Sequence, residues 1–115
     1  PQPAERTPSP ASGAHARDLR RARAQERARR QPQLRALKDR VSLAEKRIAE
    51  LEQELETLSA VLFNPTPGTD YAATNKRLKH VQDQLGALTD EWGRDASELE
   101  RLQREQDEAQ EALLN

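Results

Sequence analysis

Apolar residues recur through the first half of this chain at alternating spacings of three and four, without a break over four repeats. The members of this first stripe are Leu34, Leu37, Val41, Ala44, Ile48, Leu51, Leu55, Leu58 and Leu62. Such spacing marks the a and d positions of a coiled coil, where one helix packs a narrow apolar seam against another. The pattern predicts a helix over residues 33–63 that needs a partner helix.

A second stripe with the same spacing follows after residue 70, although Asp95 or Ala96 weakens one of its layers. Its core members are Leu78, Val81, Leu85, Leu88, Trp92 and Leu99. Residues 64–69 (NPTPGT) separate the stripes, and two prolines and a glycine in six residues cannot continue a helix. We therefore expect a loop over 64–69 and a helix over 70–114, capped by Thr69 or Asp70.

A loop this short favours antiparallel neighbours, so the predicted fold class is all-α, a two-helix antiparallel coiled-coil hairpin that is monomeric. If the turn is centred on residues 66 and 67, facing residues have numbers that add to about 133. Trp92 then faces Val41 beside the small Ala44 and belongs to the core. Phe63 and Tyr71 flank the loop, and we expect them to close the hairpin tip.

Composition excludes most other classes. The chain is 34% charged and 34% hydrophobic with three aromatic residues, too few large apolar groups for a globular core. It has no cysteine, hence no thiolate metal site, and no apolar run long enough to span a membrane. Carboxylates on solvated helix faces build no concave site, so we expect no catalytic residues, no metal and no cofactor. The absence of methionine suggests a piece of a larger protein.

The N-terminal part is basic and the rest is acidic. Residues 1–40 hold 11 Lys or Arg against 4 Asp or Glu, and residues 41–115 hold 8 against 16. Residues 1–15 are rich in proline and predict a disordered linker. Residues 16–32 predict a helical lead-in, with a start or kink of the following helix at Pro32. The arginines of this lead-in are Arg17, Arg20, Arg21, Arg23, Arg27, Arg29 and Arg30.

Two partners are open for these arginines. They can hold the phosphates of a nucleic acid, which arginine binds without losing its charge. Alternatively, they can pair with the acidic tail of the second helix, which the predicted register places opposite them. The carboxylates of that tail are Glu100, Glu105, Asp107, Glu108 and Glu111.

The order of segments over residues 17–99 resembles the C-terminal domain of ABC-F ATPases. The arginine-rich lead-in, the run Ile48-Ala49-Glu50-Leu51-Glu52, the Asn64-Pro65 loop and Trp92 carry the resemblance. Leu88, Gly93 and the extension over 100–115 depart from the family's pattern.

This resemblance implies a cytoplasmic parent ATPase that uses ATP and Mg²⁺ outside this chain. The hairpin would be its nucleic-acid-binding appendage, acting on branched or duplex DNA, or on ribosomal RNA and the ribosome. Two alternatives remain. One is a structural coiled coil that contacts other proteins, and the other is the tRNA-binding hairpin of a class I aminoacyl-tRNA synthetase.

Overall fold

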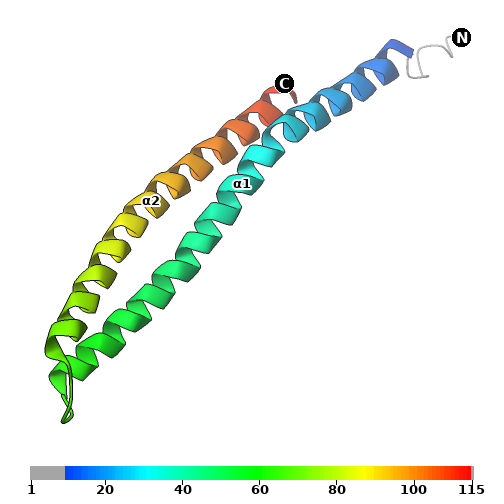
Figure 1. Ribbon diagram of the computed structural model, residues 1–115. Helices are drawn as coiled ribbons and strands as arrows, with labels where there is room; N and C mark the ends of the chain where they lie inside the picture. The colour runs from blue at the N-terminus through cyan, green and yellow to red at the C-terminus, as the bar shows by residue number, and fades with distance from the viewer. Residues whose placement is uncertain (1–9, 115) are drawn as a thin grey trace, which may run out of the picture. The chain divides into compact units, whose positions relative to one another are not determined.

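The computed structural model describes residues 10–114, and the side chains of 13–114. It contains two helices, α1 (Pro10–Phe63) and α2 (Tyr71–Ala112), joined by residues 64–70 (Figure 1). The predicted all-α hairpin is confirmed. Of the expected linker, residues 1–9 lie outside the described part of the chain. Residues 10–15 belong to α1, so the linker does not extend over them.

Pro32 was expected to mark a helix start or a kink, and the start is wrong, because Pro32 lies inside α1. A proline at this position removes one backbone hydrogen bond and crowds the preceding turn. Its flanks are rich in Ala, Arg, Gln and Leu, which are strong helix formers. Pro32 is also exposed, so water can reach the carbonyl group that it leaves without a partner. Local propensity therefore outweighs the proline.

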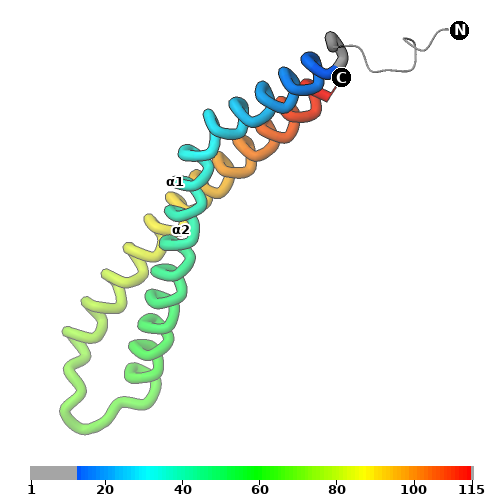
Figure 2. Tube along the Cα trace, turned by 90° about the vertical axis from the view of Figure 1, so that its right-hand side faces the viewer, coloured from blue at the N-terminus to red at the C-terminus, as the bar shows by residue number. Residues whose placement is uncertain are grey.

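The chain divides into two compact units. Unit 1 combines residues 1–35 with 100–115, and unit 2 is the single segment 36–99. In both, α1 and α2 run side by side in opposite directions, as two views at right angles show (Figures 1 and 2). In unit 1 the first turns of α1 extend beyond the end of α2 (Figure 1).

Unit 2 holds most of the apolar seam. All of the predicted core residues within it are buried or half-buried. Those with the least exposure are Leu37, Ala44, Leu51 and Val81. Arg77 contacts Glu54 and Arg40 contacts Asp95, each two residues from the facing position in the predicted register. The pairing of the two stripes is therefore close to the one that the loop predicts.

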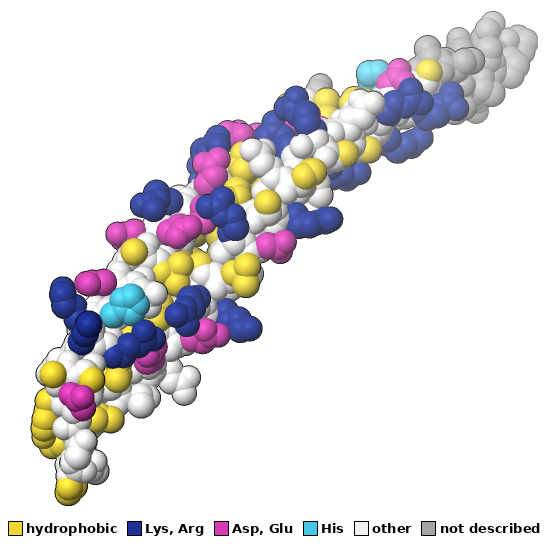
Figure 3. All heavy atoms as spheres, in the orientation of Figure 1, with side chains coloured by type: hydrophobic (Ala, Val, Ile, Leu, Met, Phe, Trp, Pro, Cys, Tyr) yellow, Lys and Arg dark blue, Asp and Glu magenta, His cyan; other side chains and the backbone are white. Residues whose placement is uncertain are grey.

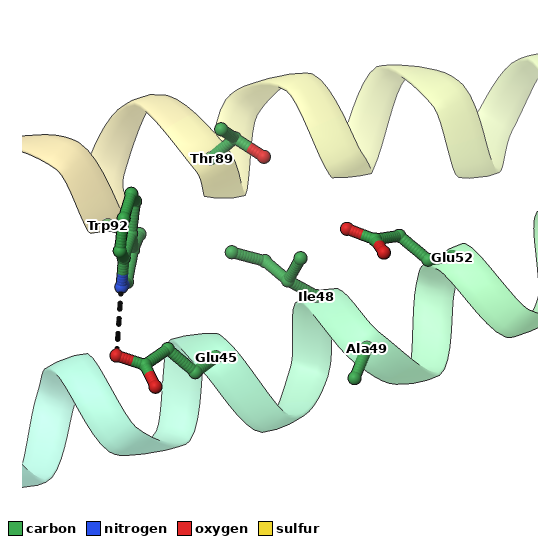
Figure 4. Close-up of a pocket in the computed structure, with 6 residues that line it drawn as sticks. All are labelled: Glu45, Ile48, Ala49, Glu52, Thr89 and Trp92. Carbon is green, nitrogen blue, oxygen red and sulfur yellow. Dashed lines mark hydrogen bonds between the residues drawn. The ribbon is translucent and has the colours of Figure 1, made fainter.

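Trp92 is half-buried at the edge of this seam. Its indole Nε1 donates a hydrogen bond to Oε1 of Glu45 at 3.3 Å, and the ring borders an open groove with Ile48 (Figure 4). The indole thus reaches one turn further along α1 than a pairing with Val41 requires. It has a polar partner at its exposed edge, as buried tryptophans usually do.

The turn between the helices is held by its own hydrogen bonds. Thr69 Oγ1 donates to the carbonyl oxygen of Thr66 at 2.7 Å and accepts from the Thr66 amide at 3.0 Å. Gly68 has φ of 91°, a conformation that side chains disfavour. Asp70 then caps α2, because its Oδ1 accepts from the Ala73 amide at 3.0 Å. Of the two predicted caps, Asp70 is the one used.

Candidate phosphate-binding surface

The seven lead-in arginines point in different directions from α1. Arg23 and Arg30 lie on the side of α1 that packs against α2, and both are half-buried. The Arg30 side chain is 19% exposed; its Nε donates to Glu26 Oε1 at 2.7 Å and its Nη1 to Glu105 Oε2 at 3.3 Å. One arginine thus joins its own helix to the acidic tail, as one of the two sequence alternatives requires.

The hydrogen bond from Arg30 holds the pKa of Glu26 below its usual value. The same bond raises the pKa of Arg30, with a smaller contribution from the Glu105 carboxylate. Both groups therefore keep their charges over the whole physiological range of pH.

Arg23 is engaged differently. Its carbonyl oxygen accepts a hydrogen bond from Gln110 Nε2 at 3.0 Å, between residues that face each other in the predicted register. Its Nε is buried with no partner, and so is Oε1 of Gln106 in the same unit. A buried polar atom without a partner costs about 1–3 kcal/mol. Leu34 and Leu102 are the most buried apolar residues of the unit 1 seam. The rest of this seam therefore includes polar groups, and two of their buried atoms have no hydrogen-bond partner.

Four arginines remain free of ion pairs among the described residues, and all four are exposed. They are Arg17, Arg20, Arg21 and Arg27, which we call the outer arginine face. At 3.6 residues per turn they fall within about 120° of arc on α1. Arg29 lies off this face and is 3.4 Å from Glu26. The other three lead-in arginines are engaged elsewhere, Arg23 and Arg30 in the seam and Arg29 beside Glu26.

No carboxylate shares the outer arginine face. The acidic residues between positions 17 and 35 are Asp18 and Glu26. Helical periodicity places Asp18 to the side of the face and Glu26 on the inner side with Arg30. Four guanidinium groups without a counter-charge therefore line about 15 Å of helix at 1.5 Å per residue. The space-filling view shows basic side chains along this part of α1 (Figure 3).

This arrangement suits a chain of phosphates. Guanidinium groups form bidentate hydrogen bonds to phosphate and stay charged at any physiological pH. Phosphates of one strand of duplex DNA succeed one another about every 3.4 Å along the helix axis, so a face of this length meets several of them. Contacts of this kind fix position on a polymer and carry no sequence information.

Sequence reasoning missed two ion pairs between the helices of unit 2, Arg77–Glu54 and Arg40–Asp95. Asp95 interrupts the second stripe, and its side chain is 13% exposed. It pairs with Arg40 Nη2 at 3.0 Å. The signal was present, because Arg40 lies close to the position that the predicted register puts opposite Asp95.

The expectation for the hairpin tip is wrong. Phe63 is 85% exposed and Tyr71 is 50% exposed, so neither closes the end of the seam. The turn is satisfied by Thr66 and Thr69 instead, which leaves both rings outside.

Comparisons with known proteins identify no relative: no protein-family model, no curated protein and no solved structure matches this chain. Within residues 10–114, no helix is long and apolar enough to cross a membrane. The same residues contain no group of three or more His, Cys, Asp or Glu side chains placed to hold a metal ion.

Proposed function

We propose that this chain is a non-catalytic nucleic-acid-binding hairpin that holds the phosphate backbone of DNA or RNA through the outer arginine face. The observation that carries the proposal is the set of four exposed arginines that have no ion pair within residues 10–114, on a face of α1 where that part of the chain places no carboxylate. The first turns of α1 also extend beyond α2, which leaves that face open to a polymer (Figure 1).

The parent protein is a finer proposal, supported only by the resemblance of residues 17–99 to the C-terminal domain of ABC-F ATPases. On this proposal the hairpin is a C-terminal appendage of a cytoplasmic ATPase. ATP and Mg²⁺ act in the parent's other domains, and the bound polymer is DNA or ribosomal RNA. Trp92 and the Asn64-Pro65 turn are the two points that support it best.

The test is a fluorescence titration of the chain against duplex DNA, branched DNA and a ribosomal RNA hairpin. Each titration is repeated from about 50 to about 200 mM salt. Contact of four arginines with duplex phosphates predicts a slope of log K against log salt of about −3 to −4. Changing Arg17, Arg20, Arg21 and Arg27 to Gln should abolish most of the binding and flatten this slope.

A matched control carries the same loss of charge elsewhere. Lys76, Lys79, Arg94 and Arg104 are exposed on α2, and their replacement by Gln also removes four cations. We expect this control to keep the salt slope of the unmodified chain. An equal loss of affinity in both variants would show that net charge alone attracts the polymer. Absence of binding to all three nucleic acids at low salt would refute the proposal.

A further inference from the structure

The two edges of the unit 2 seam differ in charge. At one edge Arg77 pairs with Glu54 and Arg40 with Asp95, so carboxylates and cations neutralise each other across the helices. Helical periodicity places an open groove at the other edge, and the charged residues of its lining are both carboxylates. We call it the acidic groove, lined by Glu45, Ile48, Ala49, Glu52, Thr89 and Trp92 (Figure 4).

Three carboxylates follow this edge along α1. Glu56 lies about one turn beyond Glu52, and together with Glu45 these residues fall within about 40° of arc and about 16 Å of helix. All three are exposed, and none has an ion pair within residues 10–114. The nearest cation on the same side is Lys38, about two turns before Glu45. These three glutamates, which we call the carboxylate row, therefore have no cation between them on this side of α1.

The acidic groove suits the planar head of an arginine. The Trp92 ring borders the groove, and its Nε1 donates to Oε1 of Glu45 at 3.3 Å. In Figure 4 the Glu52 carboxylate and the Ile48 side chain project from α1 into the space between the helices. A guanidinium bonded to a carboxylate here can stack on the indole while its methylene stem covers Ile48. The groove thus offers an arginine a counter-charge and an aromatic face.

The chain itself carries a complementary surface. The outer arginine face presents four cations without ion pairs among the described residues, over about 15 Å of α1, which is close to the length of the carboxylate row. Ala24 and Ala28 are exposed on the same side of the helix. Small side chains at these positions allow the helix to approach a groove whose lining includes Ala49 and Thr89. The two surfaces therefore match in charge and in length.

We propose that the outer arginine face of one copy docks in the acidic groove of a second copy, so that the chain self-associates through charge. The four arginines pair with the carboxylate row, and one guanidinium stacks on Trp92. The predicted monomeric hairpin remains the unit that associates, because the contact does not use its seams. Exposed ion pairs are individually weak, so the association is weak and salt-sensitive.

This inference shares the outer arginine face with the nucleic-acid proposal but does not rest on it, because self-association is measured without a polymer. Phosphates compete with the carboxylate row for the same arginines. Binding of a nucleic acid should therefore separate the copies.

The test is sedimentation velocity of the full chain without nucleic acid, from about 10 μM to about 1 mM protein at about 50 mM salt. We expect the weight-average mass to exceed that of one chain and to rise with concentration. It should return to the mass of one chain at about 1 M salt, where the Debye length is about 3 Å. The mass of one chain at every concentration in low salt would overturn the proposal.

Two variants with the same loss of negative charge identify the surface. The groove variant carries Glu45→Gln, Glu52→Gln and Glu56→Gln. The control variant carries Asp39→Asn, Asp90→Asn and Glu91→Gln, at exposed positions on other sides of unit 2. We expect the groove variant to associate at least about tenfold more weakly than the control variant, which should match the unmodified chain. Glutamine keeps an acceptor for the Trp92 indole, so circular dichroism should show unchanged folding. Equal association of the two variants would overturn the proposal.

A mixture of two defective chains supplies the sharpest measurement. The chain whose four outer arginines are changed to Gln keeps the acidic groove, and the groove variant keeps the arginines. Each alone should sediment as one chain, whereas their mixture should form a complex with one chain of each kind. A chain with both sets of changes should not join the groove variant. Failure of the first mixture to associate, or equal association in both mixtures, would refute docking of the arginines in the groove.

Discussion

Asp95 occupies a position in the second stripe where the spacing calls for an apolar residue, and its carboxylate is turned into the seam toward Arg40. Arg40 is 58% exposed, so its guanidinium keeps much of its hydration whether or not Asp95 is present. Partly exposed pairs of this kind contribute about 0–1 kcal/mol. An apolar side chain buried at the same position contributes more to the stability of the hairpin.

Asp95→Leu should therefore stabilise the hairpin, by about 1–2 kcal/mol, because a leucine that is mostly buried outweighs a partly solvated ion pair. Urea unfolding followed by circular dichroism measures the change. Asp83→Leu is the control, since the Asp83 side chain is 68% exposed and gains nothing from burial. A loss of stability in Asp95→Leu would mean that the ion pair fixes the register of the seam.

Acid should destabilise the hairpin partly through Glu54. Arg77 donates two hydrogen bonds to its carboxylate, at 2.5 and 2.9 Å, and these hold the pKa of Glu54 below its usual value of 4.5. A carboxyl group with a lowered pKa in the folded state stabilises above the pKa of the unfolded chain. That stabilisation is lost as the pH falls through the lower, folded value.

Glu54→Gln should therefore have a melting temperature that falls less than that of the unmodified chain between about pH 5 and pH 3. Thermal unfolding by circular dichroism at several pH values is the measurement. Glu56→Gln, an exposed neighbour with no ion pair among the described residues, should behave like the unmodified chain. Identical acid sensitivity in Glu54→Gln and the unmodified chain would contradict the role of the Arg77 contact.

Among the elements, the last turns of α2 have a direct effect on the proposed nucleic-acid contact. Glu105 holds Arg30 in the unit 1 seam, whereas Glu108, on the same helix, is exposed and unpaired among the described residues. Both carry the same charge. Glu105 also pairs with Arg101 of its own helix, so the comparison separates release of these two arginines from a general loss of repulsion.

Glu105→Gln should tighten duplex DNA binding more than Glu108→Gln and make the salt slope steeper by up to about 0.9, the value for one added phosphate contact. Titrations of both variants over a range of salt concentrations decide this. Equal changes in affinity with an unchanged slope would show that neither Arg30 nor Arg101 reaches the polymer once Glu105 is replaced. Such a result would leave the role of the outer arginine face intact.

The elements also show what sequence reasoning reaches and where it stops. The apolar spacing and the turn residues predicted two helices, their direction and a nearly correct register, because seam burial depends on periodicity alone. The sequence left open whether a helix starts or kinks at Pro32, since the helix-forming strength of its neighbours had to be weighed against one lost hydrogen bond. The exposed Phe63 was missed because two threonines close the turn without it.

For the molecule as a whole, the two units should differ in local stability. The unit 2 seam is mostly apolar, with Leu51 and Val81 fully buried, although it also contains Asp95 and a buried Gln84 oxygen without a partner. The unit 1 seam includes a pair of buried polar atoms without partners and an ion pair that is partly solvated. Opening a segment costs little where few apolar contacts are lost.

Hydrogen exchange should therefore be faster in unit 1. We expect amides of residues 20–30 to exchange at least about tenfold faster than amides of residues 44–55, measured by mass spectrometry after brief deuteration. Raising the salt concentration should widen the difference, because it screens the Arg30 contacts and leaves apolar burial intact. Uniform exchange along α1 would show that the chain opens as one cooperative unit.

The first turns of α1 run past the end of α2, so this part of the helix has no neighbouring helix among the described residues (Figure 1). Short helices without packing are only marginally stable in water, and heat melts them readily. A polymer that binds there must also maintain the helix, and the enthalpy of its backbone hydrogen bonds then enters the enthalpy of binding. Affinity at this end should fall with temperature well before unit 2 unfolds, which makes the contact tighter in the cold.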